Sequence, residues 1–410
     1  MATTFGPEHP EWSARWRTAT SHVIPWIAEH VPLADATVLE YGCGQGAVSC
    51  AFGPHVARHI GVDIDADAVE QARFRVAERG LDNVDLRALP VGGIVDQVRA
   101  LDQRIDVVLL YAVVEHLTRD ERLAVLEMAR DVVAEDGHVV IVECPNRLTP
   151  VDHHSSRLPF VDGLPEDVLA RYAERSPRAS FVEDIAAARA AGGAAAERLA
   201  LVRAGRGVSF HEFELVFGDL AQRTVASSYA ESLYGVRPVL WEELQLAAMM
   251  DGWRPDLPPA WSRSWIDTIL SARPLDDPPA LVRPWRMRID PDAAGAAWVR
   301  DDGRIVLGPG MRLPVRLPTA TDELHVGMIA SEDPRHAVRV HVGDRTLSPL
   351  GLRNRLGTPP WHAVAALPWV TDHVELSLAG GGELTFVGYA AAPGAPTGLD
   401  GWGSSRVFGW

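Results

Sequence analysis

Residues 38–46, which read Val-Leu-Glu-Tyr-Gly-Cys-Gly-Gln-Gly, decide the fold of this chain. An apolar run typical of a buried strand leads here into three alternating glycines, Gly42, Gly44 and Gly46. Glycine lets the backbone turn tightly and approach a ligand with no Cβ in the way. Asp63 ends the next apolar run, about 20 residues further on, where a carboxylate can accept hydrogen bonds from ribose hydroxyls. Together these features predict a site for an adenosine-type ligand.

Apolar runs and helical patterns alternate along the chain around this stretch. We expect strands at residues 37–41, 59–63, 84–89, 105–110 and 138–143. Helices are expected between them, most clearly at 66–79, after a candidate cap at Asp65, and at 119–135, where Thr118 and Glu121 have capping-box spacing. Strands that are apolar on both faces and separated by helices form a parallel, doubly wound α/β sheet of Rossmann-like type. Such a sheet binds its ligands beyond the carboxyl ends of its strands.

The rest of the chain divides around this α/β segment. We expect an N-terminal helical segment at 1–34, the α/β domain at 35–274 and a linker at 275–283. Residues 147–222, rich in Pro, Ala and Arg, interrupt the rhythm and predict a helical insertion over the carboxyl ends of the strands. Runs at 223–228 and 265–270 would complete the sheet. Residues 284–410 predict an antiparallel β-sandwich, because short runs such as 338–342 alternate valine with polar residues.

Composition narrows the class of partner. The chain has 410 residues, of which 47% are hydrophobic, and a net charge of -16 from 39 basic and 55 acidic residues. That charge disfavours nucleic acid and anionic membranes and leaves small molecules as the better candidates. Every basic residue is arginine, a codon bias typical of a GC-rich bacterial genome. Three cysteines give no disulfide framework, and neither a leader nor a long apolar run is present, so we expect a cytoplasmic protein.

Three stretches of the α/β segment resemble the class I S-adenosylmethionine-dependent methyltransferases. They are the glycine stretch, with Glu40 before it and Asp63 after it, and residues 106–117 and 135–146. The resemblance covers about residues 35–150, with a weaker echo up to 274. It implies S-adenosylmethionine as the cofactor and S-adenosylhomocysteine as the product. It places Glu40 and the glycine loop at the methionine moiety and Asp63 at the ribose.

The resemblance implies a cofactor-binding set of eight residues: Glu40, Gly42, Gly44, Gly46, Asp63, Ile64, Leu89 and Tyr111. Residues 86–90, Leu-Arg-Ala-Leu-Pro, depart from the family, which often has an acidic segment near the adenine. Adenine recognition there would be apolar and through backbone groups. A nicotinamide dinucleotide competes, since Gly42-x-Gly44-x-x-Ala47 also fits a loose dinucleotide fingerprint. The alternative function is then a nicotinamide-dependent oxidoreductase.

Methyl transfer needs an aligned nucleophile and, for a hydroxyl acceptor, removal of its proton. Asp152, His153 and His154 follow the fifth strand, and a carboxylate that orients an imidazole would supply a general base there. His116, after the fourth strand, is a second candidate. The competing interpretation is structural: a hydrogen-bonded loop that fixes the insertion, and a helix cap at Glu115.

No metal is expected for the reaction. An alternative set of ligands, Glu115, His116 and His154, resembles the magnesium site of methyltransferases that act on RNA 3′ ends. That family has a second glutamate three residues before its Glu-His pair, and Ala112 stands there in this chain. A metal-dependent RNA 2′-O-methyltransferase therefore remains an alternative that the missing ligand and the acidic charge both disfavour.

The function predicted is O-methylation of a hydroxylated small molecule or sugar-containing intermediate, in bacterial natural-product or glycan biosynthesis, with a His/Asp general base. Tryptophans of the C-terminal segment would stack on sugar rings, or pack in a core or a homodimer contact. They are Trp285, Trp298, Trp361, Trp369, Trp402 and Trp410. The non-enzymatic alternative is a glycan-recognition protein.

Overall fold

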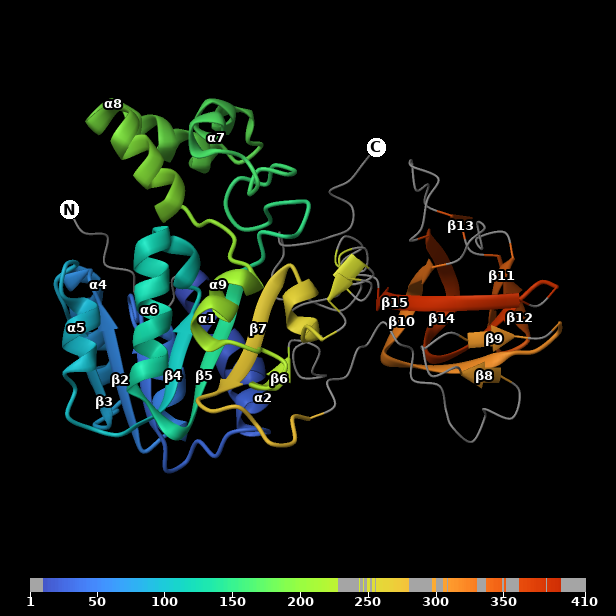
Figure 1. Cartoon of the computed structure of the whole chain (residues 1–410), viewed down its shortest axis with the longest axis horizontal. Helices are drawn as coiled ribbons and strands as arrows, with labels where there is room; N and C mark the ends of the chain where they lie inside the picture. Colours follow the sequence, from blue (N-terminus) through green and yellow to red (C-terminus); the bar gives the residue numbers. More distant parts are fainter. Residues whose placement is uncertain are drawn as a thin grey trace. The chain divides into compact units, whose positions relative to one another are not determined.

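The computed structural model describes residues 10–227, 243, 246, 249–250, 253–254, 256–279, 297–299, 305–307, 309–329, 337–348, 350–351, 361–380 and 382–391. Contacts group the chain into two compact units, each described here by itself (Figure 1). The first contains residues 1–233 and 263–281, and the second contains 234–262 and 282–410.

The first unit is built on a seven-stranded sheet with the strand order β3-β2-β1-β4-β5-β7-β6. Strands β1 to β5 run parallel, whereas β7 pairs antiparallel with both β5 and β6. The predicted Rossmann-like sheet is therefore confirmed, with an antiparallel edge. The strand bounds are β1 Thr37–Tyr41, β2 Arg58–Asp63, β3 Val84–Ala88, β4 Ile105–Tyr111, β5 Val133–Pro145, β6 Thr224–Ser227 and β7 Trp265–Ser271.

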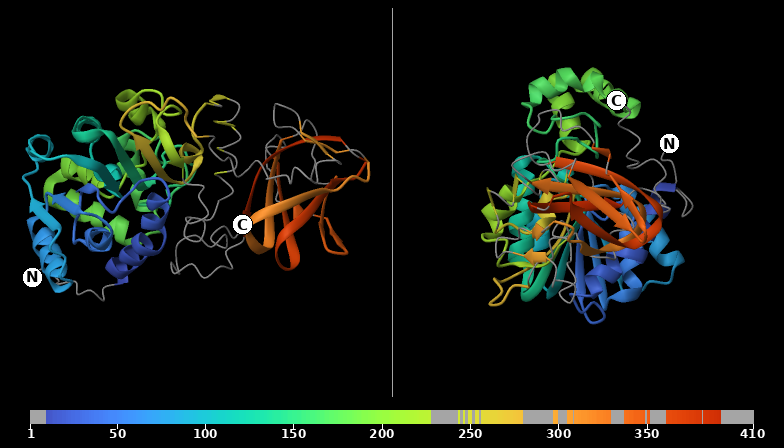
Figure 2. Two further views of the ribbon diagram at one scale, coloured as in Figure 1. Left: turned by 90° about the horizontal axis from the view of Figure 1, so that it is seen from below. Right: turned by 90° about the vertical axis from the view of Figure 1, so that its right-hand side faces the viewer.

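Helices cover both faces of this sheet (Figures 1 and 2). Before β1 the chain runs through α1 (Pro10–Thr18), the π-helix η1 (Ala19–Val23) and α2 (Ile24–Ala28), which continue the predicted N-terminal helix. Trp26 and Ile27 of α2 are fully buried in one core cluster with residues of β1, β4 and β5. In Figure 1, α6 and α9 lie in front of the sheet and α2 lies behind it. The remaining helices are α3 Ala47–Phe52, η2 Gly53–His55, α4 Ala66–Glu78, α5 Ile94–Arg99, η3 Val114–His116, α6 Arg119–Val132 and α9 Phe210–Phe217.

Two helix starts follow the predicted capping chemistry. Asp65 accepts hydrogen bonds from the amides of Asp67 and Ala68 and so caps α4. Thr118 and Glu121 form a reciprocal capping box at the start of α6. Both caps fix the direction in which these helices leave the carboxyl edge of the sheet.

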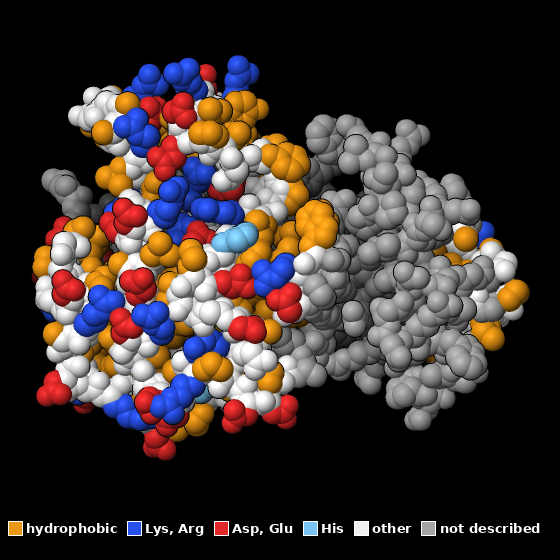
Figure 3. Space-filling model, viewed as in Figure 1, with side chains coloured by type: hydrophobic (Ala, Val, Ile, Leu, Met, Phe, Trp, Pro, Cys, Tyr) orange, Lys and Arg blue, Asp and Glu red, His pale blue; other side chains and the backbone are white. Residues whose placement is uncertain are grey.

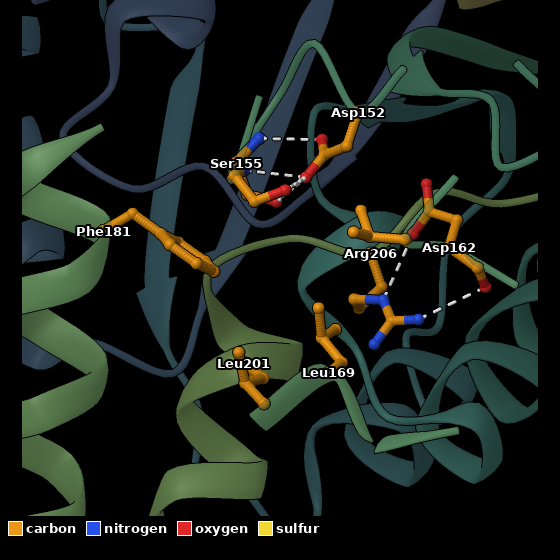
Figure 4. A pocket seen from close by; sticks show the side chains of 9 residues that line it. Asp152, Ser155, Asp162, Leu169, Phe181, Leu201 and Arg206 are labelled. Atoms are coloured by element: carbon orange, nitrogen blue, oxygen red, sulfur yellow. Dashed lines mark hydrogen bonds and ion pairs between the residues drawn. The ribbon is translucent and has the colours of Figure 1, made fainter. Parts of the chain in front are cut away.

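The insertion contains α7 (Glu166–Tyr172), η4 (Ala173–Arg175) and α8 (Ala179–Arg203), which interrupts its helical geometry at Gly192 and Gly193. It has a small core of its own, including Leu169, Phe181 and Leu201. Figure 4 shows the pocket beside that core. Its polar lining includes the ion pair of Arg206 with Asp162 and the hydrogen bond from Ser155 to Asp152, and its apolar lining includes side chains of the core. On the face seen in Figure 3, arginine side chains gather over the insertion and just beneath it.

Arg122 of α6 fastens the returning end of the insertion to the sheet. Its guanidinium is 3% exposed and donates to the carbonyls of Val114 (3.1 Å), Arg206 (3.2 Å) and Gly207 (3.3 Å). It also pairs with the Glu212 carboxylate at 2.8 Å. A buried charge is tolerated only when its partners are complete, so Arg122 and Glu212 depend on each other.

The second unit contains an eight-stranded antiparallel sheet with the path β12-β11-β14-β10-β15-β9-β8, and β13 beside β14. Val338, Val340 and Val342 are buried in its core, as predicted. His341 was expected on the polar face, but it is 6% exposed because its ring lies between the hydroxyls of Thr346 (2.9 Å) and Ser377 (2.7 Å). The strands are β8 Ala297–Val299, β9 Ile305–Leu307, β10 Leu313–Ile329, β11 Val338–Val342, β12 Arg345–Leu347, β13 Leu350–Gly351, β14 Trp361–Leu378 and β15 Gly382–Ala391.

The antiparallel strands of this unit are confirmed, and a two-layered sandwich stays a prediction. Trp369 is 45% exposed. The other tryptophans lie outside the described residues, or their side chains do: Trp285, Trp298, Trp361, Trp402 and Trp410.

The cysteines and the hydrophobicity of the helices, two features of the sequence, are also described by the structure. Cys43, Cys50 and Cys144 are all buried and unpaired, so none of them forms a disulfide. Within the part of the chain that the structure describes, no helix has the length and hydrophobicity that a membrane span requires.

We expect Arg122→Met to lower the free energy of unfolding by about 3–5 kcal/mol, because it removes the short ion pair of the Glu212 carboxylate, which keeps a longer one to Arg147 at 3.6 Å, and leaves three carbonyls without their donor. Urea unfolding followed by circular dichroism measures the change. Arg99→Met is the control, since it removes only an exposed ion pair with Asp131 at 3.0 Å, which contributes about 1 kcal/mol or less. Equal losses in the two variants would contradict the anchoring role of Arg122.

Candidate functional site

The glycine loop after β1 leaves an open space above Gly44. Gly42, Gly44 and Gly46 all have positive φ, of 83°, 47° and 78°. A Cβ on Gly42 would lie 2.5 Å from Val113 Cγ2, whereas a Cβ on Gly44 would meet no atom within 4 Å. Gly42 is therefore required by packing inside the protein, and Gly44 by its backbone conformation at an open surface. That opening is where the resemblance places the cofactor, so the loop fits such a ligand.

Asp63 ties this loop to the end of β2. Its Oδ2 accepts a hydrogen bond from the Gly44 amide at 2.7 Å, and its Oδ1 accepts one from the Asp65 amide at 2.9 Å. Each carboxylate oxygen can accept a second hydrogen bond, so the group can also receive ribose hydroxyls. Ile64 is 46% exposed beside it, and Leu89 is half-buried, with its amide bonded to the Asp63 carbonyl at 2.8 Å. The predicted nucleoside-binding residues thus lie together.

Glu40 lies beneath the loop. Its side chain is 2% exposed, and Oε2 accepts hydrogen bonds from Ser49 Oγ at 2.5 Å and His59 Nε2 at 2.9 Å. These hydrogen bonds join β1 to α3 and β2, and the contact with the methionine moiety that the resemblance implies stays a prediction. Ser49 and His59 carried no sequence motif that would have identified them as its partners.

Beyond β4 and β5, three titratable side chains converge. Glu115 and His116 belong to η3, and His154 comes from the loop after β5. One ligand atom from each lies within 4.8 Å of the others, so these side chains have the donor set to hold a divalent cation. The imidazoles of His116 and His154 lie 5.3 Å apart, and Trp265 packs edge-on against His154 at 5.6 Å.

The last turn of α8 and the loop after it fix this cluster. His116 Nδ1 lies 2.8 Å from the Arg203 carbonyl, which can only accept, so Nδ1 carries the proton and Nε2 keeps a lone pair. The Arg203 guanidinium returns a hydrogen bond to the His116 carbonyl at 2.7 Å. Gly205 lies against His154, where a Cβ would come within 2.3 Å of the ring. Arg203 and Gly205 were not predicted, because nothing in the sequence pairs Arg203 with His116, 87 positions earlier, or Gly205 with His154, about 50 positions earlier.

Burial keeps the cluster neutral near pH 7. Desolvation raises the pKa of Glu115, which is fully buried, to about 8. Desolvation also lowers the pKa of His154 to about 4 and that of His116 below its usual value. His116 Nε2 lies 3.8 Å from Glu115 Oε1, an oxygen that has no hydrogen-bond partner among the described residues. A neutral imidazole with a free lone pair can accept a proton from an acceptor molecule.

Asp152 does not orient either imidazole, which corrects the predicted His/Asp arrangement. Its carboxylate accepts hydrogen bonds from the amides of His154 (3.0 Å), Ser155 (2.9 Å) and Ser156 (2.7 Å), and from both serine hydroxyls. These hydrogen bonds hold the pKa of Asp152 below its ordinary value. The structural interpretation therefore applies to Asp152, because short polar side chains stabilise such turns. His153 is not part of the cluster that His154 joins.

Tyr111 at the end of β4 belongs to a second group of contacts. Its hydroxyl donates to Glu143 Oε1 at 3.0 Å, and its ring lies under the Arg15 guanidinium, 5.7 Å from the centroid. Ala112, directly after β4, has a positive φ of 48°, and Glu143, near the end of β5, has a positive φ of 59°. Strained backbone of this kind concentrates at functional sites. The sequence places Tyr111 there, but it does not single out Arg15 or Glu143.

Comparisons with known proteins find methyltransferases. A family model described as "Methyltransferase domain" matches residues 38–137. An uncharacterized methyltransferase, YcgJ, of Bacillus subtilis is 31% identical over 129 residues, covering 32% of this chain and 45% of that protein. A ubiquinone biosynthesis O-methyltransferase of Stutzerimonas stutzeri is 28% identical over 116 residues, covering 28% of this chain and 47% of that protein. The chain thus spans about half the length of these curated relatives.

Among solved structures, magnesium protoporphyrin IX methyltransferase from Synechocystis with bound S-adenosylmethionine aligns with a TM-score of 0.28 and 20% identity, covering 33% of this chain and 61% of that one. The matched family model covers the glycine loop, Asp63 and the Glu115–His116 pair. By this match, residues 38–137 of the first unit are similar to a methyltransferase domain, which supports S-adenosylmethionine as the cofactor.

Proposed function

We propose that this protein transfers a methyl group from S-adenosylmethionine to a hydroxyl oxygen of a small molecule or a sugar-containing intermediate. One observation carries the proposal: His116, with a free Nε2, lies beside Glu115 and His154 just past the strand ends at which the cofactor loop opens. The name of the relative from Stutzerimonas stutzeri, an O-methyltransferase, supports an oxygen acceptor.

The cofactor supplies an electrophilic methyl group on a sulfonium. Asp63 accepts the ribose hydroxyls while it holds the Gly44 amide, so the nucleoside and the loop share one anchor. His116 Nε2 takes the acceptor's hydroxyl proton, and the Arg203 carbonyl on Nδ1 keeps the ring in that tautomer and orientation. The resulting imidazolium faces Glu115 Oε1 at 3.8 Å. His154, packed between Gly205 and Trp265, closes the side of the cluster.

The setting of the reaction is proposed from the sequence. The lack of lysine supports a bacterial source, and three buried, unpaired cysteines suit a reducing cytoplasm. The second unit, proposed as a β-sandwich, would recognise the saccharide part of an acceptor, with the exposed Trp369 as a surface for a sugar ring. A net charge of -16 disfavours nucleic acid as the acceptor.

The metal-dependent alternative has one observation in its favour, the convergence of Glu115, His116 and His154 within 4.8 Å. The acid–base proposal predicts that turnover survives dialysis against EDTA and does not rise when Mg²⁺, Mn²⁺ or Zn²⁺ is added. Turnover is measured as S-adenosylhomocysteine released with a panel of catechol and glycoside acceptors. Loss in EDTA with recovery on adding one metal would establish the alternative.

We expect Asp63→Ala to weaken binding of S-adenosylhomocysteine by roughly 10- to 100-fold, because a hydrogen bond to a charged group contributes about 1.5–3 kcal/mol. Isothermal titration calorimetry measures the affinity. Asp85→Ala is the control, since that carboxylate lies on neighbouring β3 and pairs with Arg87 at 2.6 Å. Wild-type affinity in Asp63→Ala would reject the ribose placement.

We expect His116→Asn to lower kcat roughly 10²- to 10⁴-fold, the range for loss of a general base. Asparagine can still donate to the Arg203 carbonyl, so the fold around the cluster is preserved and S-adenosylhomocysteine affinity stays within about twofold. His153→Ala is the matched control, because His153 lies outside the cluster. Undiminished turnover in His116→Asn, or an equal loss in His153→Ala, would remove the proposed base.

A further inference from the structure

Helix α1 carries a cation over the end of β4. Arg15 has a side chain that is 46% exposed. Its guanidinium lies 3.9 Å from the Glu143 carboxylate and 5.7 Å from the centre of the Tyr111 ring. An ion pair at that distance in an exposed position is weak. The planar fork of the guanidinium therefore retains N–H groups that can donate hydrogen bonds to a second carboxylate.

The helix is held in place by the cofactor loop itself. Trp12 Nε1 donates to the Gln45 carbonyl within that loop at 3.2 Å. The Trp12 ring is 6% exposed and lies near the guanidinium groups of Arg75 of α4 (5.1 Å) and of Arg79, the residue that follows α4 (4.7 Å). Arg15 follows Trp12 by three positions, so both side chains share one face of α1. The loop therefore fixes where the Arg15 guanidinium lies.

The strand order gives the direction of the ligand. Asp63 ends β2, the glycine loop follows β1, and Tyr111 ends β4; these strands are neighbours in the order β2-β1-β4. The distance from β2 across β1 to β4 is therefore about 10 Å, twice the spacing between neighbouring strands. A ligand whose ribose is bound by Asp63 and which extends across the loop brings its far end to Tyr111 and Arg15. For S-adenosylmethionine, the far end is the amino acid.

We propose that Arg15 binds the carboxylate of the methionine end of S-adenosylmethionine. The proposal rests on the cofactor site given under the proposed function. Glu143 is the carboxylate paired with Arg15 at this end of β4 and β5. Without Arg15, a ligand carboxylate would face that negative charge. With it, the carboxylate gains a bidentate partner, and Glu143 is left for the cationic amine.

The test compares two ligands by titration calorimetry on the full chain. S-adenosylhomocysteine has the amino-acid carboxylate, and 5′-methylthioadenosine has the same nucleoside and thioether without it. We expect Arg15→Gln to weaken S-adenosylhomocysteine roughly 10- to 100-fold, as expected for loss of a charge-assisted pair. Binding of 5′-methylthioadenosine should change by about twofold or less. Arg15→Lys should fall between, because lysine keeps the charge but not the fork.

Arg17→Gln is the matched control, since Arg17 is exposed on the same helix and its Nε donates to the Ser13 carbonyl, one helical turn earlier, at 3.3 Å. Thermal unfolding of each variant shows whether α1 still docks. Equal loss for both ligands in Arg15→Gln, or no loss for either, overturns the role of Arg15 while leaving the cofactor site intact. If the wild type binds neither ligand, the cofactor site fails, and the proposal fails with it.

Discussion

The hydrogen bond between the Gly44 amide and the Asp63 carboxylate, 2.7 Å long, holds the ends of β1 and β2 in one geometry. It forms only because the loop adopts positive φ at its glycines, with Gly42 packed too closely against Val113 for any Cβ. Glu40 supports the loop from below through Ser49 and His59, and Trp12 fastens α1 to it from above through Gln45. Cofactor binding and the docking of the N-terminal helix thus share one loop.

The acceptor side depends on a different kind of constraint. Glu115 and His116 follow β4 closely in sequence. The orientation of the His116 ring, however, is set by Arg203 at the end of α8 and by Gly205 in the loop after it. Arg122 anchors that returning loop through buried hydrogen bonds and the ion pair with Glu212. The insertion therefore acts as part of the candidate site, and not as a separate decoration of a methyltransferase sheet. Substitutions in the insertion should therefore change the binding of the acceptor more than they change the binding of the cofactor.

Local chemistry made much of the first unit predictable from sequence. Apolar runs ending in glycine or aspartate located the parallel strands, and the caps at Asp65 and Thr118 located two helix starts. The failures have two physical causes. Partners far apart in sequence, such as His116 and Arg203, leave no local pattern, and a local turn competes for Asp152, which binds amides two to four positions further on. The Asp152 carboxylate accepts hydrogen bonds from backbone amides and not from an imidazole. Of the two adjacent histidines, His154 belongs to the cluster and His153 does not. Arg15 was indistinguishable in sequence from any arginine on an amphipathic helix.

The central claim is that the loop at Gly44 and the carboxylate of Asp63 together hold the cofactor, with its reactive end toward His116. A crystal structure of the protein soaked with S-adenosylhomocysteine tests this most directly. The account predicts ribose oxygens within hydrogen-bond distance, about 3 Å, of the Asp63 carboxylate, and the sulfur on the side of His116. A nucleoside bound elsewhere, or a sulfur directed away from the Glu115–His116–His154 cluster, would contradict it.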